Sequence, residues 1–217
     1  FELCYQNGLI QSPFLEVGSA RVQGIMPNLC DLARKRGLEN VIGVDIQKSD
    51  GVDVLADFSI EAAEFSQHWN WGTFHTVGVF NVVEHTYNPV QVLQNVLSIT
   101  RPGGVIVVST PVIWPIHNFP GDFVRLLPDW YIEFARQNQL MLKPETFCWL
   151  SSFGLTPISS QQNNNQVQIP NFLNSGQAKS PFRYWISRFA HRLFNTFGRT
   201  HVFPNVAIGA AFQIPGK

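Results

Sequence analysis

The chain has 217 residues, and its 15 Lys+Arg balance its 15 Asp+Glu, so the formal net charge is zero. Because 45% of the residues are hydrophobic and only 14% are charged, the composition excludes an intrinsically disordered chain, a collagen and a coiled coil. The length suits one well-buried domain, which we place over residues 1–217. No apolar stretch approaches the roughly 18 to 20 residues that a membrane-spanning helix needs.

Five apolar runs of strand length recur along the first half of the chain and are rich in Val, Ile and Phe, residues that favour strands. They predict strands at residues 14–17, 41–44, 52–55, 76–80 and 105–108. Segments of helix length lie between some of them, and they predict helices at residues 25–37, 59–69 and 89–100. This alternation predicts an α/β fold, a mostly parallel sheet with helices on both faces.

Residues that favour helix ends stand at the limits of these predicted helices. Gly37 has the place of a C-terminal cap, and Ser59 has that of an N-terminal cap. Asn88 is a further candidate N-cap, followed by Pro89 at the first helical position.

The second half of the chain is less regular. We treat residues 126–217 as a C-terminal part that follows a ligand-binding core of residues 1–125. It contains two predicted helices, a polar Asn/Gln-rich loop that cannot contribute to a core, and a late strand that can return to the sheet in antiparallel orientation. These elements are expected at residues 129–137 and 181–197, 159–168 and 205–214, respectively.

Three cysteines, Cys4, Cys30 and Cys148, are widely separated and form no C-x-x-C pair. This pattern supports neither a disulfide framework nor a zinc cluster, and it favours a reducing, cytoplasmic location. Because the sequence opens at Phe1 without an initiator Met, we expect native residues before it.

In an open α/β sheet, ligands bind beyond the carboxyl ends of the strands. The first predicted strand ends in the small-residue turn Glu16-Val17-Gly18-Ser19-Ala20, whose backbone N–H groups can approach a ligand. The second strand ends at Asp45, a carboxylate suited to the two hydroxyls of a ribose. Asp57 and Phe58 follow the third strand, where they can bind the amine and cover the ring of an adenine.

Taken together, five segments resemble the ordered motifs of class I S-adenosylmethionine-dependent methyltransferases, of the type 11/23 small-molecule or glycan-pathway branch. They are residues 14–19, 41–45, 82–89, 101–104 and 109–111, and the resemblance covers about residues 13–135. It implies a Rossmann-like, doubly wound sheet of about seven strands, with S-adenosylmethionine as cofactor.

By this resemblance, Gly18 lies under the methionine part of the cofactor, Asp45 binds the ribose and Asp57 binds the adenine. The wall beside the sulfonium is formed by residues 81–85. The full set of expected cofactor contacts is Glu16, Gly18, Ser19, Ala20, Asp45, Ile46, Asp57, Phe58, Asn81 and Val82.

Three positions depart from the family pattern. Ala20 replaces the second glycine of the first turn, His75 stands where an Asp is common before the fourth strand, and Asn81 replaces an acidic residue. These departures leave a second function open, that of a cofactor-binding but inactive methyltransferase-like interaction module. A third, a nicotinamide-dependent oxidoreductase, is disfavoured because the chain lacks the third glycine of Gly-x-Gly-x-x-Gly.

The Glu84-His85 pair resembles part of the Glu-x-x-Glu-His pattern with which some ubiquinone-pathway and small-RNA methyltransferases hold a metal. Here Asn81 takes the place of the first Glu, which removes a negative charge that a hard cation needs. We therefore expect no metal, with Glu84 capping or pairing locally and His85 lining the pocket.

Residues 117–128 resemble a segment that follows the fifth strand in methyltransferases of glycan and secondary-metabolite pathways. His117, Asp122 and Arg125 there can supply a base, an orienting carboxylate and an anion clamp, or an Asp122–Arg125 ion pair can simply pin the loop. His85 and His117 are the two candidate catalytic residues, since a neutral His can take a proton from a hydroxyl acceptor.

Charge is unevenly distributed along the chain. Residues 146–217 carry six basic and no acidic residues, whereas residues 1–145 carry a net charge of −6. The basic part includes an aromatic stripe at helical spacing in residues 181–197, which either packs on its own domain or contacts a membrane surface. No aromatic-plus-basic pattern of a nucleic-acid-binding module accompanies it. The resemblance to the small-molecule and glycan-pathway methyltransferases implies a small-molecule or glycan acceptor methylated on O or N.

Overall fold

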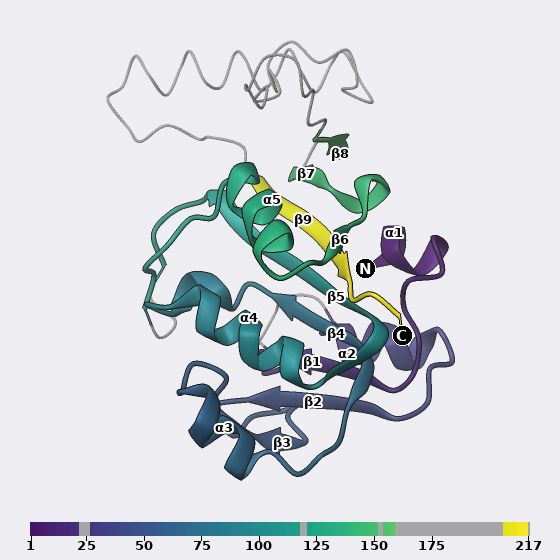
Figure 1. Cartoon of the computed structure of the whole chain (residues 1–217), viewed down its shortest axis with the longest axis vertical. Helices are drawn as coiled ribbons and strands as arrows, with labels where there is room; N and C mark the ends of the chain where they lie inside the picture. Colours follow the sequence, from purple (N-terminus) through teal and green to yellow (C-terminus); the bar gives the residue numbers. More distant parts are fainter. Residues whose placement is uncertain (22–26, 118–120, 152–153, 159–205, 217) are drawn as a thin grey trace.

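A computed structural model of the chain describes residues 1–21, 27–117, 121–151, 154–158 and 206–216. The described strands form one sheet in the order β3-β2-β1-β4-β5-β9-β7-β8, with the short β6 also paired to β9. Figure 1 shows this order from β3 at one edge to β8 at the other.

The first five strands of the sheet are parallel, as the sequence predicts. They are rich in Val, Ile and Phe because a parallel strand is covered on both faces, and all four residues of β1 are buried. Their bounds are β1 Phe14–Val17, β2 Val41–Asp45, β3 Val54–Leu55, β4 Phe74–Phe80 and β5 Thr100–Ile113.

The antiparallel edge begins with β9, Val206–Gln213, which pairs with β5 in antiparallel register. This confirms that the last strand runs against the parallel set. The described sheet has nine strands rather than about seven, because three short strands join this edge. They are β6 Met141–Leu142, β7 Cys148–Ser151 and β8 Gly154–Pro157.

Helices cover both faces of the sheet, so the doubly wound arrangement is confirmed. Alternate residues of β5 enter two separate cores: Ile106 and Val108 pack with α3, α4 and α5, whereas Val105 and Val107 pack with α1 and α2. Figure 1 shows α3, α4 and α5 in front of the sheet. The helices are α1 Glu2–Gln6, α2 Leu29–Lys35, α3 Ala62–His68, α4 Pro89–Ser98 and α5 Pro128–Gln137.

Two of the predicted helix ends have the expected capping geometry. After α2, Gly37 has φ +80°, and the amides of Gly37 and Leu38 donate to the carbonyls of Arg34 and Ala33, which is a Schellman motif. Asn88 caps α4 by accepting from the Gln91 amide, with Pro89 at the first helical position.

Two predicted helix starts are wrong. The amide and hydroxyl of Ser59 both donate to Asp57 Oδ1 in a local turn, so Ser59 does not cap a helix and α3 begins only at Ala62. The helix α2 begins at Leu29 rather than at residue 25, because Asn28 accepts from the Asp31 amide and fixes the start there.

The predicted helix at 181–197 and the polar loop at 159–168 lie outside the described residues, and so does most of the basic part of the chain. Within the described residues, every helix is too short or too polar to cross a bilayer. A short 3₁₀ helix, Pro144–Thr146, leads into β7.

Candidate functional site

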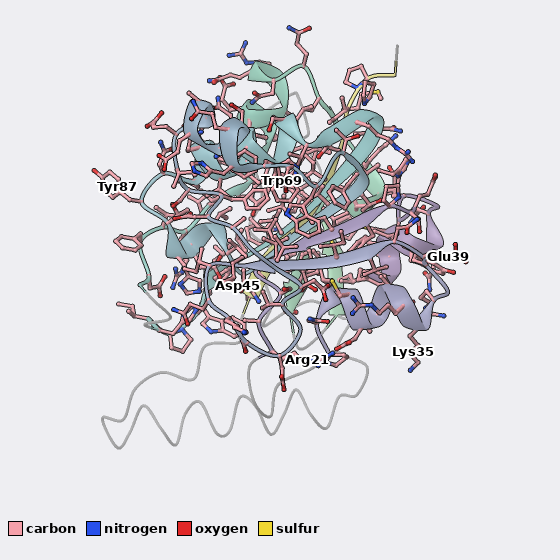
Figure 2. The ribbon with its side chains drawn as sticks, turned by 90° about the horizontal axis from the view of Figure 1, so that it is seen from below. Arg21, Lys35, Glu39, Asp45, Trp69 and Tyr87 are labelled. Atoms are coloured by element: carbon pink, nitrogen blue, oxygen red, sulfur yellow. The ribbon has the colours of Figure 1, made fainter. Side chains whose placement is uncertain are left out.

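The carboxyl ends of the parallel strands lie side by side at one end of the sheet. In register, Val17 of β1 lies beside Val44 and Val79, Asp45 lies beside Leu55 and Phe80 lies beside Ser109. The segments that follow these strands therefore share one rim. Figure 2 shows Asp45 at one end of β2 and Glu39, just before the strand, at the other.

The turn after β1 is packed tightly against the segment after β4. Gly18 has φ +80°, a conformation that L side chains rarely adopt. A Cβ built on Gly18 would lie 2.3 Å from Cγ2 of Val82, so only glycine fits this contact. Val82 thus meets the first turn, as expected for two segments that line one site.

The amides of this turn are used within the protein, which corrects the expectation that they approach a ligand. Gly18 N and Ser19 N donate to the carbonyl of Val44 at 2.8 and 3.0 Å. Ala20 N donates to Asp45 Oδ2 at 3.1 Å. These bonds fix the turn to β2, and they place the backbone of Ala20 against the acid.

Asp45 is partly exposed at the rim and holds both neighbouring segments. Its Oδ2 accepts from Ala20 N, and its Oδ1 accepts from Gln47 N at 3.1 Å. Each carboxylate oxygen has a second lone pair, so the fixed carboxylate can still accept from two hydroxyl groups. Ile46 follows it, with a side chain 53% exposed, and supplies an apolar surface beside the acid.

Two expected contacts of the first turn are buried instead. Glu16 is 4% exposed and accepts from Cys30 N at 2.8 Å, so it anchors the first turn of α2, and burial raises the pKa of its carboxyl. Ser19 is fully buried, and within the described residues its hydroxyl has no hydrogen-bond partner. Both residues shape the turn rather than offering side chains at the rim.

The segment after β3 offers one of its two expected contacts. Asp57 is exposed at the rim, with its Oδ1 held by Ser59. Phe58 is 3% exposed, and its ring packs at centroid distances of 4.8 Å on Phe65 and 5.6 Å on Trp69. The ring of Phe58 belongs to the hydrophobic core, so the expectation that it covers an adenine is wrong for this structure.

Asn81 stands at the turn after β4 with φ +54°, a left-handed conformation that Asn tolerates better than most residues. Its amide donates to Ser109 of β5, so the turn is fixed to the neighbouring strand. His75 also departs from the family pattern, but it lies near the amino end of β4, at the end of the sheet opposite to the carboxyl ends of the strands. It therefore has no bearing on a site at the carboxyl edge.

The 3₁₀ turn Val83–His85 follows and places a buried acid beside a histidine. Glu84 is 1% exposed, and within the described residues neither oxygen of its carboxyl has a hydrogen-bond partner. The expectation that Glu84 caps a helix end through a hydrogen bond is therefore wrong, whereas a local pairing with His85 is present. Its Oε1 lies 3.8 Å from Nε2 of His85, whose Nδ1 contacts the carbonyl of Gly121.

The loop after β5 brings His117 to the same place. The amides of Phe123 and Val124 donate to the carbonyl of Glu84, which docks the loop on the 3₁₀ turn. The rings of His85 and His117 meet edge to face with centroids 4.9 Å apart. Within the described residues, ligand atoms of Glu84, His85 and His117 all lie within 4.8 Å of one another.

Asp122 holds His117 in this position. Its carboxylate is 1% exposed, and its Oδ2 accepts from His117 N at 3.0 Å and lies 3.3 Å from His117 Nδ1. Arg125 binds both oxygens of the same carboxylate, and this contact lowers the pKa of Asp122 well below its usual range. The Asp122–Arg125 ion pair that pins the loop is thus present, and the same carboxylate also contacts His117, whereas Arg125 is engaged with Asp122.

Burial raises the pKa of Glu84 from 4.5 to about 7, and this makes a testable prediction. Between those two values the unfolded chain has released a proton that the folded protein retains, so the folded state loses stability as the pH rises. The expected loss is about 1.4 kcal/mol per pH unit. Urea unfolding at pH 5 and pH 7, with a chelator present, should show this loss in the parent protein.

The Glu84→Gln variant is the control, because it keeps the shape of the side chain and removes its titration. The nearby titratable groups His85, His117 and Asp122 remain in both proteins, so only the difference between the two slopes reports on Glu84. Equal slopes would contradict a neutral Glu84 at pH 5.

Comparison with known proteins identifies the family to which this site belongs. A family model described as a methyltransferase domain matches residues 12–201, which is most of the chain. The chain belongs to this methyltransferase family. S-adenosylmethionine is the cofactor of its members.

A curated relative, the ubiquinone biosynthesis O-methyltransferase of Xanthomonas euvesicatoria pv. vesicatoria (strain 85-10), is 26% identical over 157 residues. The match covers 69% of this methyltransferase chain and 59% of the relative, so the chain spans less than two thirds of that protein.

Two solved structures share the fold. A putative methyltransferase from Bacillus halodurans C-125 has a TM-score of 0.56 and 12% identity, and the match covers 99% of this chain and 97% of that one. An S-adenosylmethionine-dependent methyltransferase from Archaeoglobus fulgidus has a TM-score of 0.54 and 13% identity, with 98% and 91% covered.

Proposed function

We propose that this methyltransferase chain binds S-adenosylmethionine at the carboxyl ends of β1 to β4 and transfers its methyl group to an O or N atom of a small-molecule or glycan acceptor. The observation that carries the proposal is the shared rim, where a fixed, partly exposed Asp45 lies beside the Gly18 turn. The O-methyltransferase named above supports an oxygen acceptor. Residues 1–217 are proposed to act as one domain, in the cytoplasm.

Each rim residue has a distinct role in this proposal. Asp45 accepts from the ribose hydroxyls, Ile46 packs on the adenosine, and Asp57 accepts from the adenine amine. The absence of a side chain at Gly18 keeps the turn close to Val82, beneath the methionine part. The bound cofactor supplies a methyl group that its sulfonium already activates, so the protein contributes mainly alignment and exclusion of water.

The two histidines are proposed to handle the proton of a hydroxyl acceptor. The Nδ1 atoms of His85 and His117 face the Gly121 carbonyl and Asp122, so a neutral ring carries its proton there. This leaves Nε2 of each ring as a free acceptor. As the new bond to the methyl carbon forms, the hydroxyl proton passes to Nε2, and the electron pair of the broken carbon–sulfur bond stays on sulfur.

The experiment that tests the proposed function has two stages. Calorimetric titration with S-adenosylhomocysteine, S-adenosylmethionine and NAD should show binding of the first two and none of NAD. A methyl-transfer assay then measures turnover with phenol, sugar hydroxyl and amine acceptors. Binding without transfer to any acceptor would favour the inactive interaction module, and preferential binding of NAD would overturn the cofactor assignment.

Replacing His117 by Ala is expected to lower turnover by about 10²- to 10⁴-fold, the usual contribution of a general base. The affinity for S-adenosylhomocysteine should stay within twofold, because His117 lies on the acceptor side of the proposed site. His68→Ala is the matched control, since His68 is exposed at the end of α3. Full activity of the His117 variant would remove this residue from the catalytic set.

A further inference from the structure

The proposed function leaves a cavity of the protein unused. It lies at an edge of the sheet where, within the described residues, strand β3 pairs only with β2, and Figure 1 shows α3 beside this strand. The volume of the cavity is about 310 Å³, within the range of about 300 to 1,000 Å³ that small-molecule sites have. Most of its lining is apolar or aromatic, and the polar members are Asp57, Glu64 and His68. Such a lining, apolar with a few polar groups, is typical of a ligand site.

Three aromatic side chains line the cavity, and one of them is exposed. The rings of Phe65 and Trp69 stack with centroids 5.5 Å apart, and the indole N–H of Trp69 donates to the Gly72 carbonyl at 2.9 Å. Trp71 is 50% exposed, and within the described residues its ring makes no hydrogen bond or ring contact. Together with Leu55, which is 58% exposed, it leaves apolar surface in water at the cavity. A ligand with an apolar body is stabilised by covering this surface.

The charge at this cavity is negative. Residues 49–100 contain six acidic residues and no Lys or Arg. Three of these acids, Asp57, Glu61 and Glu64, belong to the segment from β3 to α3, and within the described residues none of them forms an ion pair. Asp57 and Glu64 line the cavity, whereas Glu61 does not. His68 contacts the backbone carbonyl of Glu64 through Nδ1 at 2.8 Å, so this ring nitrogen is used within α3. Unpaired carboxylates beside apolar surface attract a cation.

We propose that this cavity binds a small organic cation, in which an ammonium group is carried on an apolar or aromatic body. The ammonium group pairs with the carboxylate of Glu64 and donates charge-assisted hydrogen bonds to it. The body of the ligand packs on Leu55 and Trp71. The aromatic lining favours an ammonium ion further, because the face of an indole ring attracts a cation.

Other classes of ligand fit this lining less well. A phosphate or another anion would face two carboxylates and no Lys or Arg among the described lining residues. A metal ion would give up its hydration shell to a lining that is mostly apolar. A neutral apolar molecule would cover Trp71 but would remove water from Glu64 without supplying a partner for its charge. An ammonium group on an apolar body uses both parts of the cavity.

The cavity is separate from the proposed site of methyl transfer. Of the expected cofactor contacts only Asp57 also lines the cavity, and Ser59 already holds one oxygen of that carboxylate. Because the ammonium group is assigned to Glu64, the cofactor and the cation can be bound at the same time. The chain thus has a second small-molecule site, which takes a positively charged ligand.

The test uses the full chain with phenethylammonium as the probe and 2-phenylethanol as its neutral counterpart of nearly the same shape. An NMR titration should show saturable binding of phenethylammonium, with the indole N–H signal of Trp71 among those that shift. The affinity for 2-phenylethanol should be about tenfold lower, because its hydroxyl cannot form the charge-assisted bond to Glu64.

Two variants and their matched controls assign the contacts. Glu64→Gln and Trp71→Ala should each weaken the binding of phenethylammonium by about fivefold, since each removes one proposed contact. Glu61→Gln removes the same charge from the same segment but outside the cavity. Trp114→Ala removes a Trp that is 43% exposed after β5. Both control variants should bind the probe as the parent protein does.

Several results would overturn the cation site. They are the lack of saturable binding at millimolar phenethylammonium, equal affinity for the amine and the alcohol, and equal weakening by Glu64→Gln and Glu61→Gln. Displacement of the probe by S-adenosylhomocysteine is a further one, because it would place the amine in the cofactor site. If Trp71→Ala fails to fold, the two Glu variants still decide. A protein that binds the amine but not S-adenosylhomocysteine keeps this site and loses the proposed function.

Discussion

The Asp45→Asn variant is expected to bind S-adenosylhomocysteine about 100-fold more weakly than the parent protein. The carboxylate of Asp45 is proposed to accept from both ribose hydroxyls, and charge-assisted hydrogen bonds contribute roughly 1.5 to 3 kcal/mol each. Asn retains one acceptor oxygen and lacks the charge, so a loss of about 3 kcal/mol is reasonable, and each 1.4 kcal/mol is tenfold in affinity. Calorimetric titration measures this change directly.

The choice of Asn rather than Ala separates cofactor binding from folding. Asp45 also accepts from the amides of Ala20 and Gln47, and Asn can keep one of these bonds through its single oxygen. Glu39→Gln removes a carboxylate just before the same strand, at the opposite end shown in Figure 2, and should leave affinity unchanged. Unchanged affinity in Asp45→Asn, with a normal thermal unfolding midpoint, would contradict the ribose assignment.

The parallel half of the fold was predictable because its signals are local. Runs of Val and Ile gave the five parallel strands, and Gly37 and Asn88 marked helix ends through conformations that their own side chains favour. The antiparallel edge was only partly predictable. Its strands β6 and β8 are mostly exposed, and β8 begins with Gly154 and ends with Pro157, so neither strand shows the buried apolar run that marks the parallel strands. The prediction of a helix start at Ser59 failed because a Ser hydroxyl can form a hydrogen bond within a local turn as well as cap a helix.

The candidate site also has a part that the sequence predicts and a part that it does not. Topology alone places Gly18, Asp45 and Asn81 at one edge, because parallel strands end together. Which side chains face the rim depends on packing, and so Phe58, which follows an edge strand, enters the aromatic core instead.

The spacing of residues in the sequence also could not predict that the rings of His85 and His117 are in contact. Each residue was a candidate alone, but their juxtaposition depends on the loop after β5 docking on the carbonyl of Glu84. The burial of Glu84 follows from the same docking. No local pattern encodes a contact between segments that are far apart in the chain.

Gly18→Ala is expected to destabilise the protein by about 2 to 5 kcal/mol. A left-handed conformation costs an L residue roughly 1 to 2 kcal/mol, and an overlap in a packed region costs about 1 to 3 kcal/mol more. Both apply here, since φ is +80° and the new Cβ would lie 2.3 Å from Val82. Urea unfolding should show the loss, and the affinity for S-adenosylhomocysteine should fall with it as the turn is displaced.

Two comparisons separate these costs. Gly72→Ala has a similar φ of +77° with nothing within 4 Å of the new Cβ, so it should show the backbone cost alone. In a double-mutant cycle with Val82→Ala, the coupling should recover about 1 to 3 kcal/mol, because the methyl group of Val82 that causes the overlap is gone. If Gly18→Ala costs no more than Gly72→Ala, the close contact between the first turn and Val82 is not present in solution, and the proposed cofactor site loses its most restrictive feature.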